Sequence, residues 1–426
     1  MVSVKNVLKY VKSLYSSIVH SIAFYPVLIC LGFVILAMTI LSFETREMAD
    51  LLKENLSSLY IQHTETARTI LSTVIGGILS LTVFSFSMVM VVLNQASSNY
   101  SPRLLPGLIS DSKHQIILGI YTGTLLYCLL ILTSLGSYNS SEDSVGFSTF
   151  LGAIFGILCV CLFIYFIHGI SVVIQIDHII EKIYKESDQH LKRTIEKNEA
   201  CEAPNAIWKI IYSTHSGYFS EFDTDLMPKA LKEEENTLEI LPYIDKHIWE
   251  GDPLFRIQKQ ISSEQLADLQ LCVRFVKDQH ESSTYIGGLI KLMEIAVKAM
   301  SPGINDPGTA IDVITRITLL AVQVFEVPMQ TKTASNDDAF TVIQNTIIPS
   351  ELMRKVFQPI RFYARNDCAV TYQLVRSLNF LFRATQNKPA KKVIQEELKA
   401  IGDGLENSNF STYDRENITA MLQDSH

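Results

Sequence analysis

Hydroxyl and amide side chains recur every seven residues along one uncharged stretch of the chain. The repeat consists of Thr73, Ser80, Ser87 and Asn94. Seven residues make about two helical turns, so these side chains share one face of a helix and make it polar along its length. Oxygens of this kind can replace the water around an ion, and the face could then line an aqueous path. Small polar residues in membranes more commonly let helices pack closely, and both interpretations stay open.

A polar face that contains two histidines begins near the end of a later uncharged stretch. His168, Gln175 and His178 fall on one side of a predicted helix. An ionisable group near the membrane boundary is energetically expensive, so this face is a candidate for gating or pH sensing. A hydrogen bond to a neighbour in a helix bundle is the alternative. His178 and Glu181 also have a spacing seen among bundle metal ligands, but the sequence shows no second such pair, and we assign no metal.

A turn rich in proline and glycine, residues 301–309, separates two predicted helices and contains candidate ligands. Ser301 or Asn305 can bond the open carbonyl groups of the first helix, and Asp306 can cap the second. A turn capped in this way needs no ligand to be stable. The free amides at the helix start could instead attract an anion. Since Asp306 opposes an anion, a cation that bridges Asn305, Asp306 and Asp312 is the other ligand hypothesis.

Two arginines form a basic helix face in an otherwise acidic region. Arg361 and Arg365 lie one helical turn apart. We expect salt bridges within the chain or between subunits, with Asp306 and Asp312 as candidate partners. Binding of phosphate or a nucleotide is the less favoured interpretation, because no glycine-rich phosphate loop accompanies the arginines.

Four long uncharged stretches must position the first two of these groups. No Asp, Glu, Lys, Arg or His occurs in residues 21–43, 69–102, 115–141 and 144–167. Each stretch supplies the roughly 20 residues that a helix needs to cross the hydrocarbon core of a bilayer. The sequence therefore predicts a transmembrane domain, 21–175, of four helices at about 22–43, 69–94, 115–136 and 148–174.

Two pairs of glycines in these helices have the spacing of packing seams. They are Gly119 with Gly123 and Gly152 with Gly156, each pair four residues apart. Glycine at this spacing lets the backbone of a neighbouring helix approach closely. We expect these pairs to lie at contacts between the membrane helices.

The distribution of charge orients the helices. The first 20 residues contain three lysines and no carboxylate, and the loop before the fourth helix has only Glu142 and Asp143. Positive residues favour the cytoplasmic side, so both termini are predicted to be cytoplasmic. Residues 1–20 also repeat apolar side chains at helical spacing opposite the lysines. This pattern is typical of an interfacial amphipathic helix, and it equally suits a cytosolic extension of the first membrane helix that packs on the protein's own domain. The apolar run that follows lacks a small-x-small cleavage site and is interpreted as an anchor, not a signal peptide.

The remaining chain is predicted to form a cytosolic α+β region. Residues 176–204 are predicted to continue the fourth transmembrane helix into the cytosol, because neither glycine nor proline interrupts the apolar pattern from Val172 to Ile183. Alternating apolar and polar residues predict a small β-barrel-like domain at 205–260, followed by a helical C-terminal domain at 261–426. In the latter, the polar stretch 330–338 is expected to be a loop. The fold class is an integral membrane α-helical protein with a cytosolic α+β region.

The net charge and the cysteine pattern argue against a nucleic-acid partner, a disulfide framework and a zinc site. The net charge of −8 lies entirely in residues 175–426, and an acidic cytosolic region argues against nucleic acid as a partner. Seven cysteines are scattered through the chain without a Cys-x-x-Cys motif. This pattern is typical of reduced thiols and predicts neither a disulfide framework nor a zinc site.

Three segments carry a resemblance to a known family. They are AMSPGINDPGTA at 299–310, QASSNYSPRLL at 95–105 and PIRFYARND at 359–367. Together they resemble a family of predicted bacterial inner-membrane proteins that is catalogued as domain of unknown function 2254. The resemblance implies a bacterial inner-membrane protein, and it implies no activity, substrate or cofactor.

These features predict a membrane protein that either conducts ions or acts as a scaffold for other proteins. No catalytic motif is present, so we expect neither an enzyme nor a cofactor. The leading hypothesis is a homo-oligomeric, channel-like protein in the lipid bilayer, because symmetry would repeat one polar face around a closed path. A small ion or an anionic ligand could bind its cytosolic domain. A non-conducting scaffold that docks cytosolic partners and a secondary transporter are the alternatives.

Overall fold

The computed structural model describes residues 24–43, 61, 63–99, 112–135, 146–173, 175–201, 208–277, 284–333, 339–406 and 408–423. The chain divides into two compact units. Unit 1 comprises Met1–Ser98 and Leu104–Gln175, and unit 2 comprises Asn99–Arg103 and Ile176–His426. The predicted interfacial helix at 1–20 lies outside the described residues.

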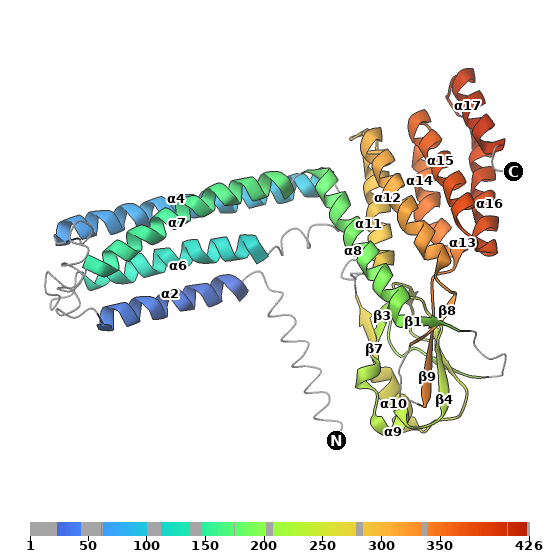
Figure 1. Cartoon of the computed structure of the whole chain (residues 1–426), viewed down its shortest axis with the longest axis horizontal. Helices are drawn as coiled ribbons and strands as arrows, with labels where there is room; N and C mark the ends of the chain where they lie inside the picture. The colour runs from blue at the N-terminus through green and yellow to red at the C-terminus, as the bar shows by residue number, and fades with distance from the viewer. Residues whose placement is uncertain are drawn as a thin grey trace. The chain divides into compact units, whose positions relative to one another are not determined.

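Unit 1 is a bundle of long apolar helices (Figure 1). Its helices are α2 (Phe24–Phe43), α4 (Thr64–Asn99), α6 (Ser112–Ser134) and α7 (Gly146–Val173). Each is long and apolar enough to cross a membrane, which confirms the prediction of several membrane helices. Among the described residues, a fifth helix of this length and composition is α12 (Pro307–Glu326) of unit 2.

Both predicted glycine pairs lie at helix contacts inside unit 1. A Cβ atom on Gly123 of α6 would lie 2.6 Å from Phe33 of α2, and one on Gly119 would lie 2.9 Å from Ile29. On α7, the same atom on Gly156 would lie 3.2 Å from Val74 of α4. The absence of side chains at these positions therefore sets how closely the helices approach.

The fourth membrane helix does not continue unbroken, which corrects the prediction for residues 176–204. Helix α7 ends at Val173, and a separate helix, α8 (Ile176–Lys197), begins after Gln175. The sequence from Ser171 to Ile176 contains four β-branched residues, which weaken a helix. Asp177 then places a negative charge in the first turn of α8, where it is favourable. A break without glycine or proline is explained by these two local preferences.

Unit 2 contains two sheets. The strands are β1 (Asn198–Ala200), β2 (Lys209–Tyr212), β3 (Gly217–Phe222), β4 (Asn236–Ile240), β5 (His247–Ile248), β6 (Pro253–Ile257), β7 (Val273–Val276), β8 (Gln330–Thr333) and β9 (Phe340–Asn345). The larger sheet has the order β1-β8-β9-β4-β6-β2, and the smaller has the order β5-β3-β7. Strands β4 and β9 are parallel, whereas their other neighbours in this sheet pair antiparallel. The sheets thus include strands from well outside the predicted β region at 205–260.

Strand β8 replaces part of a predicted loop. Residues 330–333 pair with β9 and β1, although the sequence 330–338 reads as a polar loop. This short strand contains two threonines, which favour strands. Its pairing with β9 and with β1, which is distant in sequence, forms the strand although the segment itself is polar. Residues 334–338 of the predicted loop lie outside the described part of the chain.

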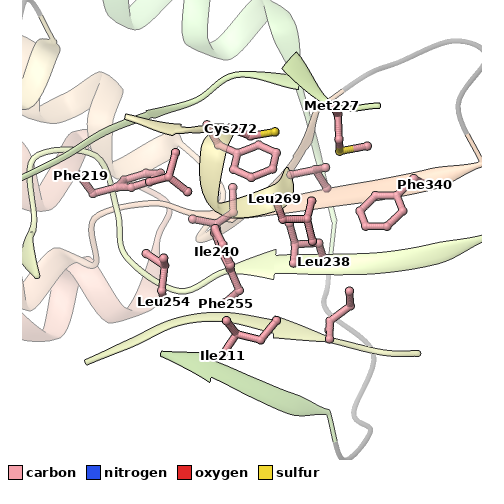
Figure 2. Close-up of a cluster of buried hydrophobic side chains, with 14 of the residues drawn as sticks. Ile211, Phe219, Met227, Leu238, Ile240, Leu254, Phe255, Leu269, Cys272 and Phe340 are labelled. Atoms are coloured by element: carbon pink, nitrogen blue, oxygen red, sulfur yellow. The ribbon is translucent and has the colours of Figure 1, made fainter. Parts of the chain in front are cut away.

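An apolar core joins the sheets of unit 2 (Figure 2). Leu238 and Ile240 of β4 are fully buried with Phe255 of β6, and Phe219 contributes from β3. Figure 2 shows these side chains gathered between the strands and α10 (Ser263–Leu271). Because side chains alternate along a strand, the residue between Leu238 and Ile240 points to the other face of the sheet.

A layer of helices adjoins the strands in unit 2 (Figure 1). Besides α8, α10 and α12, the helices are α9 (Lys229–Lys232), α11 (Tyr285–Ala299), α13 (Pro349–Leu352), α14 (Gln358–Ala364), α15 (Cys368–Ala384), α16 (Lys388–Leu405) and α17 (Thr412–Gln423), with a 3-10 turn at Thr224–Leu226 and a π-helical turn at Met353–Phe357. Ser262 caps α10 with a capping box. Asp306 caps α12, as the sequence predicts. These caps fix where the helices begin.

Candidate functional site

The predicted polar stripe of α4 lies on the exposed side of that helix. Thr73, Ser80, Ser87 and Asn94 are all exposed. The opposite side is buried against the bundle and comprises Ala67, Leu71, Ile78, Ser85 and Val92. Within the described residues of unit 1 the stripe is therefore not covered by another helix, and it is available to lipid, water or another protein.

The stripe includes an open seam of small residues. Ser72, Gly76 and Ser80 are spaced four residues apart on exposed positions of α4. A Cβ atom on Gly76 or Gly77 meets nothing within 4 Å among the described residues. The hydroxyl of Ser80 donates to the carbonyl oxygen of Gly76 at 3.0 Å, so it is satisfied within its own helix. Among the described residues, a neighbouring helix fills the Gly119–Gly123 and Gly152–Gly156 seams but not this one.

The histidine face is exposed and holds no cluster. His168, Gln175 and His178 are all exposed. Glu181, whose spacing from His178 resembles that of bundle metal ligands, lies 3.2 Å from Arg316 of α12. Within the described part of the chain, no three His, Cys, Asp or Glu residues lie together in a way that could hold a metal ion.

The Ser301–Asp306 turn has the contacts of a capped turn. One oxygen of Asp306 accepts from the Thr309 amide at 3.1 Å, and the other accepts from the Thr309 hydroxyl at 2.6 Å. These hydrogen bonds, the one from the hydroxyl foremost, lower the pKa of Asp306. Asn305 adopts a positive φ of 48°, and its amide donates to the Ser301 carbonyl oxygen at 2.9 Å. Asp312 lies 4.0 Å from Arg316, so both carboxylates already have partners.

The basic face of α14 forms an internal salt bridge. Arg361 donates through Nε to Glu397 of α16 at 2.6 Å, so its partner is neither Asp306 nor Asp312. The guanidinium of Arg365 lies 4.6 Å from the ring centre of Phe362. Both arginines line a cavity of about 350 Å³ between α14 and α16. Charge pairing within the chain, one of the two expected uses, is thus observed for Arg361.

A larger cavity, which the sequence did not indicate, lies at one edge of the six-stranded sheet. We call it the sheet-edge cavity; it has a volume of about 870 Å³. Its wall is formed by Ala200, Cys201, Leu241, Tyr243, Lys246, Pro328, Met329, Gln330, Asn345, Thr346, Ile348 and Glu351. The strand directions explain its position, because β1, β4 and β9 all end here and β8 begins here. Carboxyl ends of parallel strands are a frequent place for ligands in α/β folds.

A buried carboxylate fixes two amide side chains of this cavity. Glu239 of β4 is 1% exposed and forms an ion pair with Arg256 of β6. Its Oε1 also accepts from the side-chain amides of Gln330 at 3.1 Å and Asn345 at 3.0 Å. A buried charge is tolerated only with such partners, so this network holds the ends of β8 and β9 against β4.

Charged groups surround a tyrosine in the cavity wall. The Tyr243 hydroxyl donates to Glu351 at 3.0 Å, and Arg354 donates to the same carboxylate oxygen at 2.7 Å. Burial favours a raised pKa for Glu351, but the hydrogen bonds from Arg354 and Tyr243 leave it below its ordinary value. The ammonium groups of Lys355 and Lys246 lie 5.4 Å and 5.9 Å from the centre of the Tyr243 ring. Burial lowers the pKa of Lys355 and raises that of Tyr243.

A second buried carboxylate lies next to this group. Asp245 is 0% exposed, has a positive φ of 68° and accepts a hydrogen bond from the hydroxyl of Thr284. Burial lowers the pKa of Lys291 on α11 and of His190 on α8, and the charge of Asp245 opposes both shifts. Asp245 therefore connects the sheet to α8 and α11 electrostatically.

The sequence did not predict the residues of the sheet-edge cavity and its buried carboxylates, because they come from segments far apart in the chain. Glu239 meets partners 91 and 106 residues away. No motif spacing covers such an interval, and β8 itself was predicted as a loop. The positive φ of Asp245 in the segment Tyr243–Lys246 also has no sequence mark such as an adjacent glycine.

Comparison with known proteins gives the family and no activity. The chain is similar to uncharacterised proteins of Mycobacterium tuberculosis and Mycobacterium bovis, with 27% identity over 264 residues. The match covers 58% of this chain and 49% of each relative, so the chain spans about half the length of the curated relatives it matches. No solved structure matches the chain. A family model described as a predicted membrane protein matches residues 19–379, and the chain therefore belongs to the DUF2254 family of predicted membrane proteins.

Proposed function

We propose that the protein is a homo-oligomeric, channel-like protein of the bacterial inner membrane, with unit 2 as a cytosolic regulatory region. The observation that carries this proposal is the exposed polar stripe of α4. In a membrane, four hydroxyl or amide side chains on one exposed face are costly against lipid. Repetition of the same face around a symmetry axis would place these groups against one another or against water.

Four of the five apolar helices are proposed to cross the membrane. In α12, half of the residues in the apolar stretch are buried within unit 2, whereas in α2 only 6% are buried. Helix α12 also contains Arg316, which contacts Glu181 of α8. Burial inside a folded layer and an ion pair along the helix support α12 as a core helix. Four spans place both termini on the cytoplasmic side, in agreement with the charges of the loops.

A non-conducting scaffold is the second candidate, and a specific observation favours it. The hydroxyls of Thr73 and Ser80 already donate to carbonyl oxygens of α4, at 2.7 Å and 3.0 Å. Side chains satisfied in this way can form a dry seam between two copies of α4 without hydrating an ion. Both candidates are homo-oligomers. They differ only in whether ions pass along the symmetry axis.

Ion flux separates the two candidates. We would reconstitute the full chain in potassium-loaded liposomes and compare wild type with Ser80→Leu and Ser87→Leu. Thr122→Leu is the matched control, because Thr122 is an exposed hydroxyl residue of α6 outside the stripe. If α4 lines the path, both serine variants reduce flux about tenfold, since each puts an apolar side chain in place of an oxygen ligand. Thr122→Leu retains flux.

Three results would count against conduction along α4. Equal flux in wild type and both serine variants would move the path away from this helix. No flux under any ion gradient, pH or membrane tension would leave the scaffold. A strictly monomeric protein in detergent, measured by light scattering, would remove the symmetry axis on which both candidates depend.

A further inference from the structure

We propose that the sheet-edge cavity binds an organic phosphate monoester, with two lysines at the phosphate: Lys246, which lines the cavity, and Lys355, which lies beside the ring of the wall residue Tyr243. This site belongs to unit 2 and does not depend on whether the membrane helices conduct. The volume of about 870 Å³ is within the range of cavities that bind small organic ligands. Its wall combines the ends of β1, β8 and β9 with the loops that follow β4 and β9.

Two cations at or beside the wall favour a doubly charged anion, because Lys246 lines the cavity and Lys355 lies over the ring of the wall residue Tyr243. Among the described residues, neither Lys246 nor Lys355 has a carboxylate within the 4.0 Å of an ion pair, although unit 2 as a whole is acidic. The nearby carboxylates are engaged elsewhere: Glu351 accepts from Arg354 and Tyr243, and the buried Asp245 accepts from Thr284. Two ammonium groups beside one ring match the two charges of a phosphate monoester, whereas a single carboxylate would need only one.

The remaining wall suits an apolar or aromatic body attached to the phosphate. Leu241, Pro328, Met329 and Ile348 line the cavity, and Met329 and Ile348 are 44% and 46% exposed. Large apolar side chains exposed on a concave surface are typical of ligand sites. Asn345 and Gln330 are held in place by the buried Glu239, so the polar part of the wall is formed before a ligand arrives.

Two sources could supply this chemistry, a soluble nucleotide or the head group of a phosphatidic acid. The probes are therefore AMP and dihexanoyl phosphatidic acid. Adenosine and inorganic phosphate serve as the matched fragments, because adenosine lacks the anion and phosphate lacks the body. Isothermal titration of the detergent-solubilised full chain measures each dissociation constant.

We expect one of the two organic phosphates to bind at least about tenfold more tightly than adenosine and inorganic phosphate, and the better probe identifies the source. Lys246→Met and Lys355→Met should each weaken that binding about tenfold, since each removes a charge-assisted contact to phosphate. Lys391→Met is the control variant, because Lys391 also lies over an aromatic ring, that of Phe382, away from the cavity. It should bind as wild type does.

A thiol in the cavity wall gives a second readout that does not depend on these variants. Cys201 lines the cavity, is half-buried and has a pKa raised by burial. Cys368 of α15 shares these properties but lies at another surface. Saturating organic phosphate should slow maleimide modification of Cys201 severalfold and leave Cys368 unchanged.

Binding by neither organic phosphate overturns the proposal. Equal affinity for inorganic phosphate overturns it as well, because the apolar wall would then contribute nothing. Unchanged affinity in the Lys246→Met and Lys355→Met variants, or protection of both thiols alike, would place the ligand outside this cavity and also refute it.

Discussion

The side chain of Ser187 on α8 lies against the backbone of Gly288 on α11, in the space that any larger residue at Gly288 would need. A Cβ atom on Gly288 would lie 1.8 Å from the Ser187 hydroxyl oxygen and 3.0 Å from its Cβ. The hydroxyl is held there because it donates to the Ile183 carbonyl oxygen at 2.6 Å. Helix α8, which follows α7 in sequence, is thereby packed directly on the helical layer of unit 2.

Gly288→Ala should destabilise unit 2. The new methyl group forces α8 and α11 apart or displaces Ser187, at a cost of about 1–3 kcal/mol typical of overpacking. The midpoint of thermal unfolding, followed by circular dichroism, measures the loss. Gly404→Ala on α16 is the control, because among the described residues nothing lies within 4 Å of a Cβ there. Ser187→Ala combined with Gly288→Ala should recover part of the loss; no recovery would show that the hydroxyl is not the obstacle.

Gly123→Ala should weaken the helix bundle of unit 1, whereas Gly76→Ala should not. The added methyl group would meet Phe33 at 2.6 Å in the first case and nothing within 4 Å of the described residues in the second. The buried thiols of Cys128 and Cys159 report unfolding, because a thiol-reactive dye reaches them only when the bundle opens. We expect a decrease of several degrees for Gly123→Ala, in line with about 2–4 °C per kcal/mol for a domain of this size. Equal midpoints in the two variants would contradict the role of the Gly119–Gly123 seam.

The stability of unit 2 should fall as the pH drops below about 6.5 because of His190. Burial lowers the pKa of this side chain, Asp245 opposes the shift, and Arg193 adds to it. The unfolded state, with an ordinary pKa of about 6.5, then binds a proton before the folded state does. Stability is therefore complete above the unfolded pKa and is lost as the pH falls toward the folded value. His190→Gln should flatten the unfolding midpoint against pH, whereas the exposed His178→Gln on the same helix should keep the slope.

Asp306→Ala should cost unit 2 about 1 kcal/mol through the loss of the α12 cap. Asp306→Asn should cost less, because an amide oxygen can still accept from Thr309. Because the pKa of Asp306 is lowered, its contribution to the stability of unit 2 also depends on pH, in a more acidic range than that of His190. Its contribution is present above the unfolded value of about 3.9 and disappears as the pH falls through the lower folded value. Chemical denaturation at pH 7 and pH 3 measures both effects. An unchanged free energy of unfolding in Asp306→Ala at pH 7 would show that the turn does not need its cap.

Local features of the fold were predictable from sequence, and long-range ones were not. The membrane helices follow from uninterrupted apolar stretches, and the Ser262 and Asp306 caps follow from residue type beside a helix start. The seven-residue period predicts that the α4 stripe lies on one face of the helix. It could not predict that this face is exposed, because a polar face of a membrane helix can pack inside a bundle or lie outside it. The sheet-edge cavity was missed because Glu239 and Asn345 are brought together only by strand pairing between distant segments.

The parallel pairing of β4 with β9 also determines when this region can finish folding during synthesis. The antiparallel partner of β4, the strand β6, is complete at Ile257, but its parallel partner is complete only at Asn345. While α11 and α12 are being made, one edge of β4 has its hydrogen-bonding groups exposed in the nascent chain. A stop codon within this interval would release chains with an open sheet edge, and a ribosome pause there would prolong the exposure of that edge to other chains.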